Sequence, residues 1–270
     1  MQDLQETAVQ SILITRWLGR NYHYLASTGS TNDLLKQMAA GDGRQPPTGT
    51  VLLADYQSQG RGRLQRRWEA PPGTALLFSV LLRSGWPAAQ ANWLTMIASL
   101  AAAQAISALC PALAVGIKWP NDVMVQQAGT WCKVGGLLLE SEVDGNGRIP
   151  TAILGIGLNV NMTTAQLPQA ATPPTSLLAA TGQPVSRRAL LAALLAELET
   201  LYETADSGQS PQQVWQKQLI TLGQQVKMTE VGNGRTLHGT ASGTNLWGHL
   251  QVTDASGQVH TVTAGDVTLR

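Results

Sequence analysis

The amino-acid sequence predicts an α+β fold, in which a mixed or antiparallel sheet with helices is followed by a small C-terminal β-barrel. In the first part of the chain, apolar runs typical of buried strands are interrupted by Ala/Leu-rich helical stretches, but without the strict alternation of a βαβ fold. From Gly223 onward, only short β-type runs remain, separated by Gly, Asn and Ser residues. We therefore expect two domains, residues 1–222 and 223–270.

Elements of the two domains follow from apolar periodicity and from helix caps. Ser27–Asn32 offers several N-cap residues for the first long helix, and Pro111 marks the end of the second. In chain order, the first domain is expected to contain a helix within 9–18, a strand at 22–25, a helix at 33–40, strands at 50–56 and 74–82, a helix at 88–109, a strand at 115–118, a hairpin of 123–125 and 133–142, a strand at 149–159, and helices at 187–202 and 211–222. The second domain is expected to contain strands at 225–231, 236–244, 248–254 and 259–264.

The composition excludes several classes of protein. The chain has 270 residues, of which 43% are hydrophobic, and is long enough to bury a substantial core. A formal net charge of +1 argues against binding nucleic acid through the field of the whole molecule. The two cysteines are too few for a disulfide framework or a four-ligand zinc site, and they fit a reducing compartment. Because there is neither a secretory signal nor an apolar run of about 18 residues, we expect a cytoplasmic protein outside the membrane.

The most informative segment is the arginine loop, which we define as Gln57–Trp68. Four arginines lie in this loop: Arg61, Arg63, Arg66 and Arg67. Glycine lets the backbone approach a ligand closely, and both Gly60 and Gly62 lie beside the first arginine. Guanidinium groups match carboxylate and phosphate oxygens in bidentate fashion. The loop suits an anionic ligand with a flat ring, such as a nucleotide, although its composition fits a solvated basic turn equally well.

Three further segments combine glycines with cations, amides or carboxylates. Lys118-Trp-Pro-Asn-Asp122 follows a short strand, Lys133-Val-Gly-Gly-Leu-Leu-Leu-Glu140 opens another, and Gly155-Ile-Gly-Leu-Asn-Val-Asn161 places two glycines before two amides. Glycine within a strand often marks the close approach of a ligand or of another backbone. Taken singly, each segment also fits a surface strand end or a pair of packing glycines. The sequence contains no P-loop motif, so ATP would have to be bound in another way.

Together and in this order, these segments resemble the catalytic core of the biotin protein ligases. The resemblance covers residues 22–270 and includes the C-terminal barrel, which is similar to the SH3-like domain of that family. It implies a class II synthetase-like catalytic core. The pieces that carry the resemblance are Ser30-Thr-Asn32, Gln57, Gly60-Arg-Gly-Arg63 with Trp68, Lys118–Asp122, Lys133–Glu140 and Gly155–Asn161.

The resemblance implies a two-step ligase reaction with ATP and biotin as substrates and Mg²⁺ as the accompanying ion. The biotin carboxylate attacks the α-phosphate of ATP, which gives biotinyl-5′-AMP and pyrophosphate. A lysine of a biotin carboxyl carrier protein, the acceptor domain of acetyl-CoA carboxylase, then attacks the mixed anhydride and releases AMP. Many family members carry an N-terminal DNA-binding domain, for which the 20 residues before Asn21 leave no room. We therefore expect a monofunctional ligase without a DNA partner, either a monomer or a homodimer.

The resemblance also assigns residues to each part of the reaction. The implied catalytic residues are Arg61, Arg63, Lys118, Asp122 and Lys133. The implied biotin site comprises Ser30, Thr31, Asn32, Gln57, Arg61, Gly62, Arg63, Lys133, Gly135 and Gly136. The implied ATP site comprises Trp68, Lys118, Asn121, Asn159 and Arg270. Metal ligands are not identified, although Asn121 is a possible contact to phosphate or Mg²⁺.

Three other functions fit parts of the sequence. A lipoate–protein ligase shares the superfamily core and the adenylation chemistry, but the arginine loop and Lys118–Asp122 favour biotin. A nucleic-acid-binding module could use the arginine loop as a basic patch, and a steep salt dependence of DNA binding would reveal it. A catalytically silent biotin-binding protein would release no pyrophosphate, and the intact set of Lys118, Asp122 and Lys133 argues against it.

Overall fold

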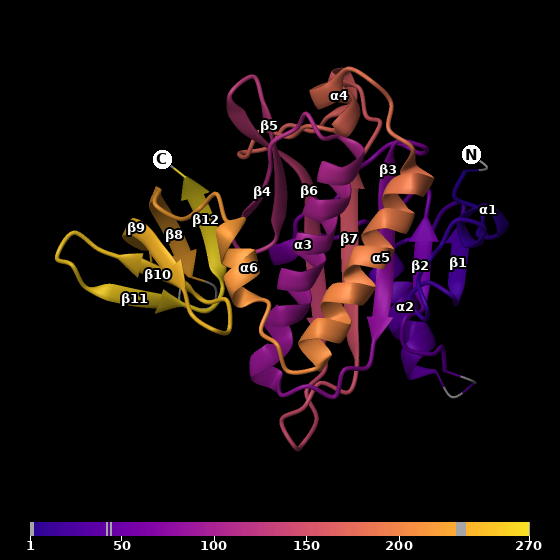
Figure 1. The fold of residues 1–270 in the computed structure, drawn as a ribbon, viewed down its shortest axis with the longest axis horizontal. Coiled ribbons are helices and arrows are strands. Elements are labelled where there is room, and N and C mark those ends of the chain that lie inside the picture. Colours follow the sequence, from indigo (N-terminus) through magenta and orange to yellow (C-terminus); the bar gives the residue numbers. More distant parts are fainter. Residues whose placement is uncertain (1–2, 42, 44, 231–235, 270) are drawn as a thin grey trace.

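The computed structural model describes residues 3–41, 43, 45–230 and 236–269. Figure 1 shows a large sheet covered by helices, with a smaller sheet beside it. The large sheet has seven strands in the order β1-β2-β3-β7-β6-β5-β4. Its strands are β1 (Tyr22–Leu25), β2 (Val51–Ala54), β3 (Ala75–Leu82), β4 (Val115–Lys118), β5 (Asp122–Gln127), β6 (Thr130–Ser141) and β7 (Ala152–Asn159). Because β1 pairs with β2 in parallel and the other neighbours are antiparallel, the sheet is mixed, which confirms the predicted fold class.

One face of the large sheet is covered by two long helices, α3 (Ala91–Leu109) and α5 (Arg187–Asp206), which pack against each other (Figure 1). Side chains alternate between the two faces of a strand, and Val51, Leu53 and Val80 belong to the core on this side. Within the described residues, Ala88–Leu109 is long and apolar enough to cross a membrane, but most of it is buried inside the protein. It serves here as a core helix.

The other face of the sheet carries helix α2 (Thr31–Ala40). Leu52 and Leu81, which alternate with the core residues of the first face, pack here against Leu35 of the helix. Further along the same face, the apolar side chains give way to Ser79 on β3 and to Gly155 and Gly157 on β7. This change from apolar to polar and small residues leaves room for a site beside the N-terminus of α2.

The smaller sheet has five antiparallel strands in the order β11-β10-β9-β8-β12 and fits the predicted SH3-like barrel. Its strands are β8 (Gln225–Glu230), β9 (Thr236–Thr244), β10 (Leu250–Thr253), β11 (Val259–Val262) and β12 (Gly265–Leu269). Strand β12 was not predicted, whereas Val231, the predicted end of the first barrel strand, lies outside the described residues. Trp93 and Trp119 donate their indole N–H groups to the carbonyls of Leu246 and Gly248, which joins the two sheets.

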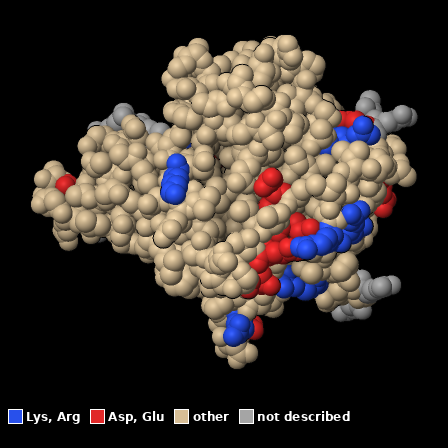
Figure 2. Space-filling view, viewed as in Figure 1, with Lys and Arg blue, Asp and Glu red and all other residues tan. Residues whose placement is uncertain are grey.

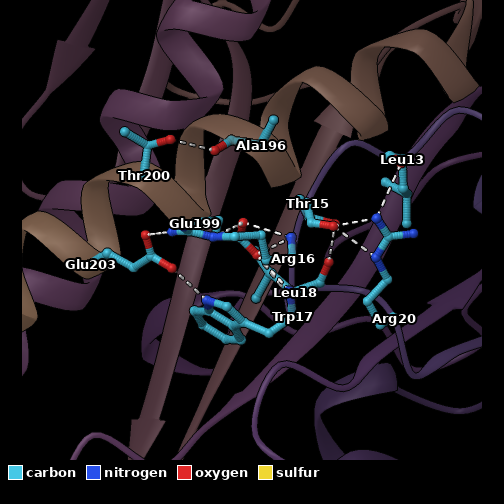
Figure 3. A network of polar contacts seen from close by, with 10 residues as sticks. All are labelled: Leu13, Thr15, Arg16, Trp17, Leu18, Arg20, Ala196, Glu199, Thr200 and Glu203. Carbon is cyan, nitrogen blue, oxygen red and sulfur yellow. Dashed lines mark hydrogen bonds and ion pairs between the residues drawn. The ribbon is translucent and has the colours of Figure 1, made fainter.

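The predicted helix within 9–18 is wrong, because the described helix α1 covers only Glu6–Gln10. The residues that follow are held in turns by the Glu199 carboxylate of α5, which accepts backbone N–H groups from Arg16, Trp17 and Leu18 (Figure 3). A backbone whose N–H groups point at a carboxylate cannot use them in helical hydrogen bonds. The remaining helices are α4 (Leu177–Thr181), which was not predicted, α6 (Gln212–Lys217), and short 3-10 turns at Arg63–Gln65, Ala88–Gln90 and Thr164–Gln166.

Candidate active site

A cavity of about 640 Å³ lies on the α2 face of the sheet. Its walls are the N-terminus of α2, the arginine loop, the proline-rich segment 168–174, and strand β12 of the small sheet. Predicted site residues that line it are Ser30, Thr31, Asn32, Gln57, Arg61, Gly62, Arg63, Trp68, Lys118, Asn121, Asp122, Lys133, Gly136 and Asn159. Residues far apart in the sequence thus meet around one cavity.

One predicted residue lies elsewhere, and another is outside the described residues. Gly135 is not part of the lining; a Cβ atom at this position would meet the Leu158 side chain and the Gly157 carbonyl oxygen, so close packing with β7 accounts for the glycine. Arg270 lies outside the described residues. Sequence analysis also missed lining residues, namely segment 168–174 and Asp266, Val267 and Thr268 of β12. The sequence carries no local signal for β12, whose position depends on its pairing with β8.

Lys133 reaches the cavity because of an irregularity in the sheet. Val123 pairs with Gly135 but Met124 pairs with Lys133, so Val134 is an extra residue, or β-bulge, in β6. A bulge re-aims the side chains on one side of it. Val134 is fully buried in the core, whereas Lys133 points to the same side as Gly136 and forms an ion pair with Asp122 at 2.6 Å.

Two further cations of the cavity also make specific contacts: Lys118 is buried and Arg63 is half-buried. Lys118 donates to the Thr172 hydroxyl at 3.0 Å, and Arg63 donates to the Asn121 side-chain oxygen at 2.9 Å and to the Gly265 carbonyl at 3.2 Å. Burial lowers the pKa of both Lys118 and Arg63, since a desolvated cation is less stable. Cations held in a partly desolvated cavity attract an anionic ligand more strongly than cations in water.

The two ends of the arginine loop are tied to different parts of the molecule. Arg61 contacts the carboxylates of Asp33 and Glu140, each at 2.6 Å. Arg66 forms an ion pair with Asp266 of β12. The loop therefore crosses the mouth of the cavity from the large sheet to the small one.

Trp68, at the end of the arginine loop, lies flat against glycines of the sheet. A Cβ atom at Gly157 would lie 2.7 Å from the indole, and one at Gly136 would lie 3.2 Å from it. The Lys133 ammonium is 5.6 Å from the ring centroid. The buried indole N–H of Trp68 has no hydrogen-bond partner among the described residues. A ligand with an acceptor atom at this point would satisfy it.

A polar cluster forms the end of the cavity at the N-terminus of α2. Ser30 caps the helix by accepting the Asp33 N–H, so it serves as a cap while lining the cavity. The Gln57 side-chain oxygen accepts the backbone N–H of Thr31 at 2.7 Å. Amide and hydroxyl groups gathered in this way can recognise a neutral polar head group.

The described residues contain no group of three or more His, Cys, Asp or Glu side chains that could hold a metal ion. The basic residues also do not form a continuous patch on the face shown in Figure 2, where acidic and basic side chains lie beside one another and most of the surface is uncharged. This arrangement disfavours a nucleic-acid module on that face. The cavity instead combines buried cations, an indole and a polar end, which suits a ligand that is anionic at one end and neutral at the other.

Comparison with known proteins shows the family to which the chain belongs. The model of the biotin/lipoate A/B protein ligase family matches residues 24–159. The chain is 32% identical to the biotin–[acetyl-CoA-carboxylase] ligase of Mycobacterium tuberculosis, over 98% of this chain and 95% of the relative. It is 29% identical to the bifunctional ligase/repressor BirA of Bacillus spizizenii, over 90% of this chain and 71% of the relative.

Solved structures are similar over nearly the whole chain. The biotin protein ligase of Aquifex aeolicus in complex with biotin and ATP is 27% identical and superposes with a TM-score of 0.74, over 93% of this chain and 99% of that one. The Leishmania major ligase in complex with biotinyl-5-AMP is 26% identical, with a TM-score of 0.58, over 91% and 99% of the two chains. The fold and the site thus define a ligase of the adenylate-forming type. The chain belongs to the biotin/lipoate A/B protein ligase family.

Proposed function

We propose that this protein is an ATP-dependent biotin ligase, which forms biotinyl-5′-AMP and transfers biotin to a lysine of a biotin carboxyl carrier protein. The observation that carries the proposal is the convergence of Arg63, Lys118 and Lys133 on one cavity that ends in a polar cluster. Similarity to biotin protein ligases along nearly the whole chain supports it.

In the first step, the cavity brings together two anions that repel each other in water. Both Lys133 and Lys118 line the cavity. In this proposal Lys133 would bind the biotin carboxylate or the bridging phosphate oxygen, and Lys118 would face the α-phosphate. Because the transition state gathers negative charge on phosphate oxygens, cations held in position lower its energy without reorganisation. We assign Thr31 and Gln57 to the biotin head group and Trp68 to the nucleotide; all three line the cavity.

The second step uses the same cavity. The acceptor lysine must lose a proton before its amine can attack the anhydride carbonyl, and AMP leaves with the electron pair of the broken C–O bond. Asp122, paired with Lys133 at 2.6 Å, is the carboxylate placed to orient that amine or take its proton. The arginine loop would meanwhile keep water from the reactive anhydride.

Mg²⁺ belongs to the proposal as the partner of ATP. The side-chain oxygens of Asn121 and Asp122 are of the type that Mg²⁺ prefers, and substrate phosphates would supply the other ligands. When bound, the ion would neutralise phosphate charge. We further propose that the enzyme acts in the cytoplasm, as a monomer or a homodimer.

The test is ATP-dependent transfer of labelled biotin to a biotin carboxyl carrier domain, with pyrophosphate measured in parallel. We expect both signals in the wild type, and we expect Lys133→Ala to slow pyrophosphate release about 100-fold or more, since it removes an electrostatic contact to the reacting groups. Lys227→Ala, which changes an exposed lysine of β8, is the matched control. Transfer of lipoate or octanoate in place of biotin, or absence of pyrophosphate with any of these acids, would contradict the proposal.

A further inference from the structure

A chain of polar contacts connects the proposed biotin head-group site to the arginine loop. It begins at Gln57, whose side-chain oxygen accepts from the backbone of Thr31, and it continues across strand β3. The Ser79 hydroxyl of β3, fully buried, lies 2.7 Å from the Thr31 hydroxyl and donates to the Asn32 side-chain oxygen at 2.6 Å. Ser79 therefore connects Asn32 with Thr31, the residue that donates to Gln57.

The chain then passes from Asn32 to the loop. The Asn32 amide nitrogen donates to a carboxylate oxygen of Glu140 on β6 at 2.8 Å. The same oxygen, Oε2, accepts from the Arg61 guanidinium at 2.6 Å. An amide presents its acceptor and its donor on opposite sides. Ser79 therefore holds the acceptor side of Asn32, while Glu140, with the Leu138 carbonyl at 3.4 Å, holds the donor side.

The backbone geometry reinforces this arrangement. A Cβ atom at Gly155 would collide with the Asn32 amide, so the glycine gives Asn32 the only space in which it reaches both partners. Asn32 and Ser79 are buried, whereas Arg61 is half-exposed. The chain of polar contacts is therefore buried at Ser79 and Asn32 and ends on the half-exposed Arg61 at the mouth of the cavity.

Arg61 therefore has a different task from Arg63. Two carboxylates, those of Asp33 and Glu140, already engage its guanidinium, so it does not present a free cation to a phosphate. Its contacts instead fix the first part of the arginine loop to the sheet. Of the two carboxylates that bind Arg61, Glu140 is the one that also accepts a hydrogen bond from the Asn32 side chain.

We propose that Ser79 and Glu140 are positioning residues that couple occupancy of the biotin head-group site to the placement of the arginine loop, through Asn32 and Arg61. A ligand that orders Thr31 and Gln57 stabilises the orientation of Asn32, and this orientation favours the Glu140–Arg61 contact. By reciprocity, an anchored loop favours the ordered head-group site. This inference rests on the proposed function.

The first experiment needs no ligand. Trypsin cleaves after arginine, so the rate of cleavage within residues 61–67 reports how firmly the loop is held. We expect Glu140→Gln, which keeps the shape but removes the charge, to be cleaved there about tenfold faster than the wild type. Glu142→Gln changes an exposed carboxylate just beyond β6 and is the matched control. Equal cleavage of the two variants would overturn the assignment of Glu140 as the anchor.

The second experiment measures coupling by calorimetric titration of biotin without ATP. We expect Glu140→Gln and Ser79→Ala each to raise the Kd about tenfold, and the double variant to raise it by much less than the product, because both changes break one chain. Asp33→Asn should speed tryptic cleavage and raise the Kd by less than Glu140→Gln does, because it weakens the anchor of the loop but leaves the contacts among Ser79, Asn32 and Glu140 intact. A double variant whose effects multiply, or an Asp33→Asn effect as large as that of Glu140→Gln, would overturn the coupling.

The wild type separates this inference from the proposed function. If the wild type binds biotin and Glu140→Gln binds it as tightly as Glu142→Gln does, the coupling fails while the ligase proposal stands. If the wild type does not bind biotin, the proposed function and the coupling fail together, and the tryptic comparison still decides whether Glu140 anchors the loop.

Discussion

The glycines of β7 are the residues whose small size the site most clearly requires. At Gly157, an added methyl group would lie within 2.7–3.0 Å of three indole atoms of Trp68, closer than carbon atoms pack. The sequence alone indicated only that Gly155 and Gly157 allow the close approach of some group. Which side chains approach them follows from strand pairing, since Gly155 and Gly157 lie on the face that carries α2.

We predict that Gly157→Ala displaces the Trp68 indole and raises the KM for ATP about tenfold, because overpacking costs ~1–3 kcal/mol. The KM for biotin should change less, since the three atoms nearest to a methyl group at Gly157 all belong to Trp68. Steady-state pyrophosphate assays with each substrate varied in turn measure both constants. Gly145→Ala is the control, because a Cβ atom at that position meets no described atom within 4 Å. Unchanged KM for ATP in Gly157→Ala would remove Trp68 from the nucleotide site.

At the scale of the element, helix α5 holds the N-terminal part of the chain through a single buried carboxylate. Glu199 accepts the backbone N–H groups of Arg16, Trp17 and Leu18, while Glu203 binds the side chains of the first two (Figure 3). Burial raises the pKa of Glu199, but the three N–H donors and the Arg16 charge together lower it by more than burial raises it. The folded-state pKa therefore lies below 4.5. The charged form is therefore the one that stabilises the fold.

This pKa shift predicts how stability depends on pH. A carboxyl group whose pKa is lowered by folding stabilises the protein above its unfolded pKa of 4.5, and the contribution is lost as the pH falls through the lower folded value. Glu199→Gln should cost about 1–3 kcal/mol of unfolding free energy at pH 7. The difference from the wild type should shrink below pH 4.5.

Urea unfolding of both proteins between pH 7 and pH 3 measures this difference. Glu203→Gln is the comparison variant, because its carboxylate contacts side chains and leaves the backbone N–H groups of Arg16 and Trp17 bound to Glu199. A destabilisation by Glu199→Gln that stays constant over the whole pH range would show that the carboxylate charge is not the cause.

At the scale of the whole molecule, the cavity is completed by two sheets that are distant in sequence. Strand β12 contributes Asp266, Val267 and Thr268 to the wall, and Asp266 pairs with Arg66 of the arginine loop. The Gly265 carbonyl accepts from Arg63. The small sheet therefore holds the second half of the loop, as the large sheet holds the first.

We predict that Asp266→Asn speeds the dissociation of biotinyl-5′-AMP several-fold at low salt, because the loop loses its ion pair with the small sheet. The pair is largely exposed, so its contribution is about 1 kcal/mol or less and is screened by salt. Dissociation rates from stopped-flow chase experiments should rise with ionic strength in the wild type and change little in the variant. Glu69→Gln, which breaks an exposed ion pair between Arg67 of the loop and the residue just beyond the loop, serves as the control. Equal salt dependence in wild type and Asp266→Asn would contradict this role.

The fold class and the family could be predicted without a structure, because apolar periodicity, helix caps and the arginine loop are local patterns. Most of the residues that the sequence predicted for the site line the cavity, since each lies in a short motif. Their individual roles stay predictions until the variants are measured.

Only the tertiary structure decided how these motifs act on one another. The β-bulge at Val134 turns Lys133 toward the cavity, Glu140 and Asp33 engage Arg61, and Gly135 falls on the packing face. The wall formed by β12 was likewise invisible in the sequence. The physical reason is common to all of these features. Strand register and pairing join residues that are far apart in the chain, and no local pattern encodes which side chain lies opposite which.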